Sequence, residues 1–97
     1  MQLSILIRNL NEAGALRQTL LSLKRQESGG LQYEVIIVDN ESDDNSLEVA
    51  EELGCTVITM KRNEFTFGHA LNVGISHCAG EFILVMSAHI ILLNEFF

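Results

Sequence analysis

The sequence predicts an α/β fold: a Rossmann-like, doubly wound and mostly parallel sheet of about four strands with three helices. Three aliphatic runs, at 3–7, 33–38 and 82–86, have the near-continuous Val, Ile and Leu content of strands buried on both faces of a parallel sheet. Segments with helical periodicity separate the runs, and this alternation implies crossover connections. We therefore predict the strand order third, second, first, fourth.

A helix is expected between the first two strands, because Leu16, Leu20 and Leu23 recur at helical spacing with polar residues between them. Asn11 is a candidate cap for its first turn. Two consecutive glycines end the helix before the second strand. The loop and the helix together give a connection long enough for a crossover.

A shorter helix is expected after the second strand, with Ser46 as its cap and Gly54 as its stop. Leu47, Ala50 and Leu53 would face the core, and the glutamates between them would face solvent. The acidic side of this helix is most simply a solvated face.

A weaker apolar run at 55–59 predicts the third strand, and residues 67–78 predict the third helix. Three small residues in that helix, Gly68, Ala70 and Gly74, would allow it to lie close to the sheet. The fourth strand then follows at 82–86.

Composition limits the possible partners of this chain. Its 97 residues fit a single domain, and 13 acidic against 6 basic residues give a net charge of -7. Such a field repels nucleic acid and anionic membranes, so neither is an expected partner. An anionic ligand would need a metal ion or a local cation, for which Arg8, Lys61 and Arg62 are the candidates.

Cysteine usage and hydropathy point to a cytoplasmic protein. The 2 cysteines lack the spacing of a zinc site, and free thiols suit a reducing compartment. The longest apolar stretch, 82–93, is too short to span a bilayer, and no signal peptide is recognisable. The same stretch leaves apolar residues near the C-terminus, so we expect an exposed apolar surface and a homodimer.

Polar residues follow the strands at the predicted carboxyl edge, where ligands bind in open parallel sheets. The runs are 8–12, 39–44 and 87–89. Asp39 and Asn40 place an acceptor and an amide at one strand end, where they could pair with a base edge or a ribose hydroxyl. The alternative is that they form only a turn and a helix cap. Neither the glycine pattern of dinucleotide-binding proteins nor the phosphate-binding P-loop is present.

Three segments together resemble a known family: SILIRNLNEAGALRQTLLSL, YEVIIVDNESDDNSLEVA and FGHALNVGISHCAGEFILVMSAH. They are similar to the opening of a family 2 glycosyltransferase with the GT-A fold, of the bacterial rhamnosyltransferase-like type. The resemblance covers nearly the whole chain. It implies a nucleotide-sugar donor and an inverting transfer to an acceptor in polysaccharide or glycolipid synthesis.

The resemblance also implies roles for particular residues. Asn11 and Glu12 would shape the nucleotide pocket, and Arg8 is a further candidate contact of the nucleotide sugar, as a source of positive charge. The family's V-D-D-G-S turn corresponds to 38–42, so Asp39 would contact the base or ribose.

Asn40 and Ser42 belong to the same turn, with Asn40 substituting for an acidic residue. In the family's G-x-A-x-N-x-G helix, the asparagine corresponds to Asn72. Leu71 stands where the family often has an arginine, which removes one possible phosphate contact.

A departure from the family pattern follows the fourth strand, where the usual D-x-D is replaced by Ser87, Ala88 and His89. A neutral imidazole can bind a divalent metal, Mn or Mg, with manganese favoured. His89 would then be the metal ligand and Ser87 a donor contact. Alternatively, His89 donates to the phosphate directly, with Arg8, Lys61 or Arg62 supplying positive charge. A third possibility is that His89 only caps the next element.

The catalytic base and the acceptor site of the family come from sequence beyond the fourth strand. We therefore expect a truncated, donor-binding part of an enzyme, with catalytic residues that the sequence does not identify. Such a part could lie at the inner face of the membrane. Two other classes stay open: a non-catalytic nucleotide- or metabolite-binding module, and a flavodoxin-like interaction module.

Overall fold

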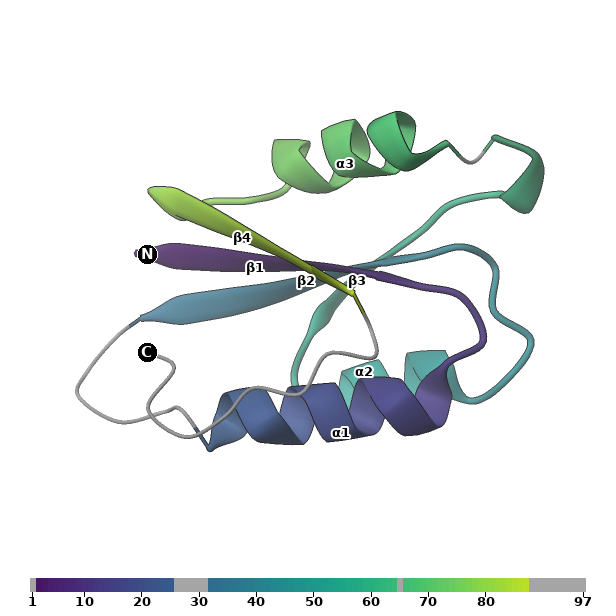
Figure 1. Cartoon of the computed structure of the whole chain (residues 1–97), viewed down its shortest axis with the longest axis horizontal. Helices are drawn as coiled ribbons and strands as arrows, with labels where there is room; N and C mark the ends of the chain where they lie inside the picture. The colour runs from purple at the N-terminus through teal and green to yellow at the C-terminus, as the bar shows by residue number, and fades with distance from the viewer. Residues whose placement is uncertain (1, 26–31, 65, 88–97) are drawn as a thin grey trace.

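The computed structural model describes residues 2–25, 32–64 and 66–87, which form one α/β sheet with helices on both faces (Figure 1). Its elements in chain order are β1 (Leu3–Asn9), α1 (Ala13–Lys24), β2 (Tyr33–Asp39), α2 (Ser46–Glu52), β3 (Thr56–Thr59), a 3-10 turn (Arg62–Glu64), α3 (Phe67–Ser76) and β4 (Phe82–Ser87). The strand order is β3-β2-β1-β4, and every pairing is parallel. The predicted fold class and strand order are confirmed.

Each face of the sheet has its own core. The face covered by α1 and α2 buries Ile5, Ile7, Leu16, Leu20, Leu23, Ile37, Val49, Ala50 and Met86. The face covered by α3 buries Leu6, Ile36, Val38, Met60 and Ala70. Because both faces are covered, β1 and β2 need apolar residues at successive positions, which explains their unbroken aliphatic runs.

The strands extend beyond their aliphatic runs, and this extension positions the polar edge. β1 ends at Asn9, β2 at Asp39 and β4 at Ser87. In the sheet register, Asn9 lies opposite Asp39 and Arg8 lies opposite Ser87. Side chains alternate between faces, so Asn9 and Asp39 point toward α1 and α2, whereas Arg8 points toward α3.

Both predicted helix caps are wrong. The residue before α1 is Glu12, with no side-chain cap, and the Asn11 side chain accepts hydrogen bonds from the β2–α2 loop instead. The residue before α2 is Asn45, and Ser46 is the first helical residue. The Ser46 hydroxyl donates to Asp44 rather than capping the helix. In both cases a contact within or between loops replaces the expected local cap.

The inward face of α2 also differs from the prediction. Leu47 is 38 % exposed, whereas Val49 is 1 % exposed and belongs to the core. Ala50 is buried and Leu53 packs against the core as predicted, so the difference is confined to Val49, which takes the inward position expected for Leu47. Gly54 ends this helix as predicted, with a φ of +78° that a glycine adopts without strain.

α3 lies close to the sheet at two of the three predicted small residues. Ala70 is buried, and a Cβ on Gly74 would collide with the Leu6 side chain. Gly68 is exposed and would meet nothing within 4 Å, so its predicted role is wrong. The helix ends at Ser76, earlier than expected. Within the described ranges, no helix combines the length and the apolarity that crossing a membrane requires.

Candidate functional site

The side chain of Asp39 is fully buried and organises the carboxyl edge of the sheet. Its Oδ1 accepts hydrogen bonds from Asn9 Nδ2 at 2.9 Å and from Ser42 Oγ at 2.7 Å. Its Oδ2 accepts from the Ser42 backbone N–H at 2.9 Å. Asn9 Nδ2 also lies 3.2 Å from Ser42 Oγ. The carboxylate therefore holds the turn after β2 against the end of β1.

The β1–α1 and β2–α2 loops are connected by further hydrogen bonds. Asn11 Oδ1 accepts from the backbone N–H of Asp43 at 2.6 Å, and the Asn11 N–H donates to Ser42 Oγ at 2.9 Å. In return, Asp44 Oδ2 accepts from the N–H of Ala13 at 3.0 Å, in the first turn of α1. Each loop thus supplies acceptors for backbone donors of the other.

Backbone strain is present in both loops. Asn11 has a φ of 51° and Glu41 a φ of 53°. Asparagine tolerates this left-handed region, but glutamate rarely adopts it, and strained residues concentrate at functional sites. The hydrogen bonds between the loops hold this conformation in place.

Two buried amide oxygens at this edge lack hydrogen-bond partners. Asn9 is 1 % exposed and Asn40 is 6 % exposed, and the Oδ1 atom of each is unpaired. An unpaired buried polar atom costs about 1–3 kcal/mol. A hydrogen-bond donor that reached either oxygen would recover this cost.

Arg62, one of the three candidate cations, fastens the β2–α2 loop from outside. Its Nη2 lies 2.7 Å from Asp43 Oδ2 and 3.0 Å from the carbonyl oxygen of Glu41. Its backbone N–H donates to Glu41 Oε1 at 2.9 Å. The guanidinium is therefore engaged within the protein.

A pocket of about 240 Å³ lies between α3 and the sheet. It is lined by Leu6, Arg8, Val38, Ala70, Leu71, Val85 and Met86. Arg8 is the one polar residue among those that line it. The hydrogen-bonded loops and this pocket thus lie on opposite faces of the same sheet, and Arg8 and Asn9 are adjacent in the chain.

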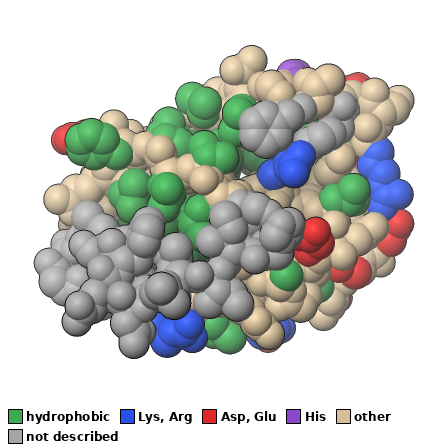
Figure 2. Space-filling model, in the orientation of Figure 1, with side chains coloured by type: hydrophobic (Ala, Val, Ile, Leu, Met, Phe, Trp, Pro, Cys, Tyr) green, Lys and Arg blue, Asp and Glu red, His purple; other side chains and the backbone are tan. Residues whose placement is uncertain are grey.

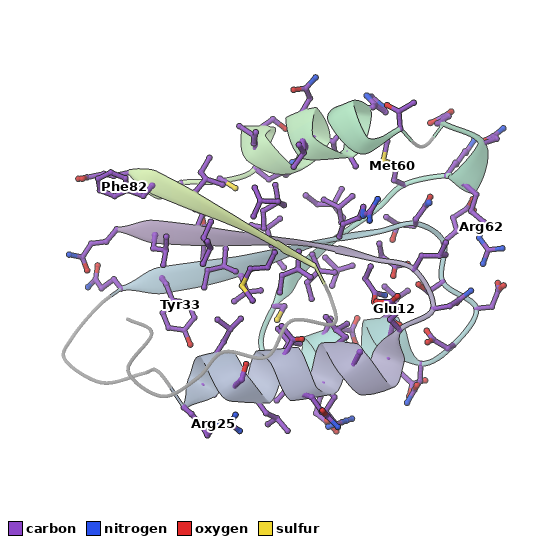
Figure 3. The ribbon with its side chains drawn as sticks, in the orientation of Figure 1. Glu12, Arg25, Tyr33, Met60, Arg62 and Phe82 are labelled. Atoms are coloured by element: carbon purple, nitrogen blue, oxygen red, sulfur yellow. The ribbon has the colours of Figure 1, made fainter. Side chains whose placement is uncertain are left out.

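The structure places the predicted site residues in several surroundings. Asn11, Asp39 and Ser42 are brought together in the hydrogen-bonded loops, and Asn40 adjoins them. Glu12 lies at the same end of the sheet, as does Arg62 (Figure 3).

Two further site residues lie away from these loops. Asn72 is exposed on α3, one residue beyond the pocket-lining Leu71. Ser87 ends β4 beside Arg8.

The predicted metal ligand, His89, lies outside the described residues, so its role stays a prediction. Within the described part of the chain, no three His, Cys, Asp or Glu side chains are grouped as a metal site would require.

Two residues of the edge were not recognised as site residues from the sequence. Asn9 was expected to follow the strand, but it is the last residue of β1 on the same face as Ile5 and Ile7. The signal available in the sequence was the spacing: Asn9 comes two positions after Ile7, on the face of the strand that Ile5 and Ile7 bury. Asp44 was counted only as a turn residue, and nothing local predicts its bond to Ala13.

A parallel sheet with helices on both faces and polar loops at the carboxyl ends of its strands has the architecture of α/β domains that bind ligands at that edge. The model for glycosyl transferase family 2 matches residues 4–97. The chain belongs to this family.

Named relatives agree with the family. The chain is 31% identical to 4,4'-diaponeurosporenoate glycosyltransferase of Staphylococcus haemolyticus, over 96% of the chain and 25% of the relative. It superimposes on TarS of Staphylococcus aureus, a poly(ribitol-phosphate) β-N-acetylglucosaminyltransferase, with a TM-score of 0.86 and 26% identity over 98% of the chain and 29% of TarS residues 1–349. TarS residues 1–349 have also been crystallised with UDP-GlcNAc, and that structure gives a TM-score of 0.81 at 27% identity over 92% of this chain and 27% of the 1–349 chain.

For a more distant neighbour, the comparison shows similarity of the fold alone. The mannosyltransferase PcManGT of Pyrobaculum calidifontis, solved with GDP-Man and Mn2+, has a TM-score of 0.77 and 21% identity over 93% of this chain and 28% of its own. The chain thus spans 25% of the length of the glycosyltransferase from S. haemolyticus and 16% of full TarS.

Proposed function

We propose that this chain forms the nucleotide-sugar-binding part of an inverting glycosyltransferase that transfers a sugar in polysaccharide or glycolipid synthesis. The observation that carries the proposal is the carboxyl edge, where Asn9 and Asn40 keep unpaired amide oxygens beside interlocked loops. Family membership supports the reaction class, and the complex of TarS with UDP-GlcNAc supports a nucleotide-sugar donor.

In this proposal, the base and ribose bind against Asn40 and the β1–α1 turn. An amide offers both a donor and an acceptor, which matches the edge of a nucleobase. The Asn40 side chain would then acquire the partner that it lacks. Asp39 would act mainly through the loops, because its buried carboxylate already accepts three hydrogen bonds. The interlocked loops would fix the site before the donor arrives, which reduces the entropy lost on binding.

Departure of the nucleoside diphosphate leaves negative charge on the oxygen that bonded the anomeric carbon. Cationic or metal contacts stabilise that charge in the transition state. The family's base, which takes the proton from the acceptor hydroxyl, comes from sequence beyond β4. The described residues would therefore bind and orient the donor.

Calorimetry with UDP, GDP and dTDP tests the donor site. We expect one of them to bind, and Asn40→Ala to lower its affinity roughly tenfold, as expected for one lost hydrogen bond of about 1.4 kcal/mol. The matched control is Asn63→Ala, which removes an exposed amide from the 3-10 turn. Binding of none of the three nucleotides would refute the function. If Asn40→Ala leaves the nucleotide affinity unchanged, only the proposed position of the base against Asn40 is refuted.

A divalent cation, Mn or Mg, is proposed to accompany the donor diphosphate. Ser87 ends β4 at the carboxyl edge opposite Arg8, and His89 follows it by two positions in the sequence. A metal there would neutralise charge on the diphosphate, and His89 would hold it through a neutral imidazole.

Metal dependence can be measured as donor affinity with and without a chelator. We expect manganese to support binding better than magnesium, and the effect to fade below the reference histidine pKa of about 6.5. His89→Asp should move the preference toward magnesium, and His89→Ala should abolish the metal effect. Binding that is indifferent to chelator in the unmutated chain would contradict the role of His89.

Self-association is proposed for the apolar side of β4. Phe82, Ile83 and Val85 are 70, 39 and 47 % exposed, and hydrophobic side chains gather on this face of the molecule (Figure 2). We expect sedimentation to show a dimer, and a clean monomer at high concentration would contradict it. The proposed location is the cytoplasm, at or near the inner face of the membrane.

A further inference from the structure

We propose that Arg62 is a positioning residue, which holds the β2–α2 loop in its binding conformation without contacting the donor. The inference rests on the proposed function, in which the base binds against Asn40. It follows from the contacts that Arg62 makes with this loop and from the backbone conformation of Glu41, the residue after Asn40.

The Arg62 side chain contacts the backbone of the loop as well as a charged group on it. Its Nη2 donates to the carbonyl oxygen of Glu41 at 3.0 Å, and its Nε lies 3.4 Å from the carbonyl oxygen of Asn40. The same Nη2 forms an ion pair with Asp43 at 2.7 Å. The Arg62 backbone N–H also donates to Glu41 Oε1 at 2.9 Å. One residue from another segment thus contacts the loop at three residues, beginning with Asn40.

The loop needs such a contact because Glu41 has a φ of 53°. The left-handed region is unfavourable for a residue with a Cβ, whereas glycine occupies it without strain. A residue persists in this conformation only where its surroundings hold it there. Relaxation of Glu41 toward an ordinary φ would move the carbonyl groups on either side of the strained bond. Arg62 donates to these carbonyl oxygens, so it stabilises the strained form of the turn.

Arg62 is itself held in place by the core. Met60, two residues earlier, is 6 % exposed and belongs to the core on the α3 face. The Met60 N–H donates to the carbonyl oxygen of Asp39 at 2.8 Å, at the end of β2. Figure 3 shows Arg62 just beyond Met60, at the end of the sheet where Glu12 lies. The guanidinium therefore contacts the loop from a segment that is anchored to the sheet.

Asn40 is the group whose position this arrangement fixes. Its backbone N–H donates to the carbonyl oxygen of Asn9 at 2.9 Å, and its own carbonyl oxygen lies against Arg62. Its side-chain Oδ1 is buried without a partner. A group that is already ordered before the ligand arrives binds more tightly, because less entropy is lost on binding. Loss of the Arg62 side chain should therefore weaken binding at Asn40 although no group that touches the donor is removed.

Position 41 provides an internal test of this assignment. With glycine there, a positive φ carries no strain, so the turn would keep its conformation without the guanidinium. Glu41→Gly also removes the Oε1 acceptor, but that contact is made to the backbone N–H of Arg62 and does not involve the Arg62 side chain. Arg62→Ala should therefore have a large effect beside glutamate and a small one beside glycine.

The experiment measures binding of UDP and of uridine by calorimetry in the full chain, with GDP and guanosine or dTDP and thymidine substituted if one of those is the preferred base. Arg62→Ala should weaken both ligands by the same factor, roughly three- to tenfold, as expected for one lost hydrogen bond. Arg62→Lys, which can still donate to one carbonyl oxygen, should recover part of the loss. In a chain that carries Glu41→Gly, Arg62→Ala should change either affinity by less than about twofold.

Arg17→Ala is the matched control. Arg17 forms an ion pair with Glu52 that joins α1 to α2, and its side chain is 43 % exposed, against 46 % for Arg62. Exposed ion pairs contribute little to stability, so thermal melts should show small and similar losses for Arg17→Ala and Arg62→Ala. Of these two substitutions, only Arg62→Ala should weaken binding.

The outcomes separate the role of Arg62 from the proposed function. If no nucleoside diphosphate binds the unmutated chain, both are overturned. If Arg62→Ala weakens UDP but not uridine, Arg62 contacts the phosphates directly, and its positioning role is overturned while the proposed function stands. The positioning role is also overturned if Arg62→Ala weakens binding no more than Arg17→Ala does, or by the same factor with glutamate and with glycine at position 41.

Discussion

Polar clusters lie at both ends of the sheet. They use similar hydrogen-bonding groups, but they differ in whether all their buried polar atoms have partners. At the carboxyl edge, Asp39 joins β1 to the turn after β2. At the amino edge, Ser4 Oγ donates to Glu34 Oε2 at 2.5 Å, which also accepts from the N–H of Ala79 at 2.7 Å, and the N–H of Gly80 donates to Ser4 Oγ at 2.8 Å.

The difference lies in what remains unpaired. Among the described residues, the buried side-chain oxygens without a partner are those of Asn9 and Asn40, and both lie at the carboxyl edge. The amino-edge cluster closes tightly around the backbone of Gly80. Hydrogen bonding alone therefore does not mark a functional site. The unused acceptors at the carboxyl edge are the feature that the amino edge lacks, and they support the proposal that a ligand binds at the carboxyl edge.

Removing the central carboxylate should have the largest effect on stability. Asp39→Ala leaves the buried donors of Asn9 and Ser42 without their acceptor, at an expected cost of about 3 kcal/mol in the free energy of unfolding. Urea denaturation measures it. Asp43→Ala is the matched control, since Asp43 is 80 % exposed and its surface pair should be worth less than about 1 kcal/mol. Equal effects of the two substitutions would remove the distinction between a buried organiser and a surface pair.

The amino edge can be broken by adding a single methyl group. A Cβ on Gly80 would lie 2.6 Å from the Ser4 backbone nitrogen and 2.7 Å from the Leu3 carbonyl carbon. Neither backbone atom can rotate away, so Gly80→Ala should cost about 2 kcal/mol through overpacking. Gly68→Ala is the control, because a Cβ there meets nothing within 4 Å and should be neutral or slightly stabilising. A harmless Gly80→Ala would show that the amino edge is looser than described.

The smallest expected effect is the pH dependence of the amino edge. Hydrogen bonds from the Ser4 hydroxyl and the Ala79 N–H hold the pKa of Glu34 below its ordinary value of 4.5. A carboxyl with a lowered pKa in the folded state stabilises the protein above its unfolded-state pKa, and this contribution is lost as the pH falls through the folded-state value. Glu34→Gln should therefore lower the melting temperature at pH 6, and the gap to the unmutated chain should narrow below pH 4.5. Melts followed by circular dichroism would test this, and a gap that stays constant with pH would contradict it.

The sequence by itself determined the class of the fold, the order of the strands and the edge where polar residues gather. Unbroken aliphatic runs are expected in strands that are covered on both faces. The helical segments between them favour right-handed crossovers and therefore a parallel sheet in this strand order. The end of α2 at Gly54 was also predictable from the local sequence, because glycine adopts a positive φ without strain. These features depend on residues that are close together in the sequence, so the sequence alone predicts them.

Only the tertiary structure decided the contacts between residues about 30 positions apart. Whether Asn9 meets Asp39 depends on the register of β1 and β2 and on each strand continuing past its apolar run. A one-residue shift of one strand against the other would turn only one of these two side chains to the α3 face, so that they would no longer meet. The first turn of α1 accepts its partner from another loop, because the Ala13 N–H donates to Asp44. In α2, Val49 rather than Leu47 is buried. In both cases, contacts with other elements decide where the helix begins and which side of it is buried.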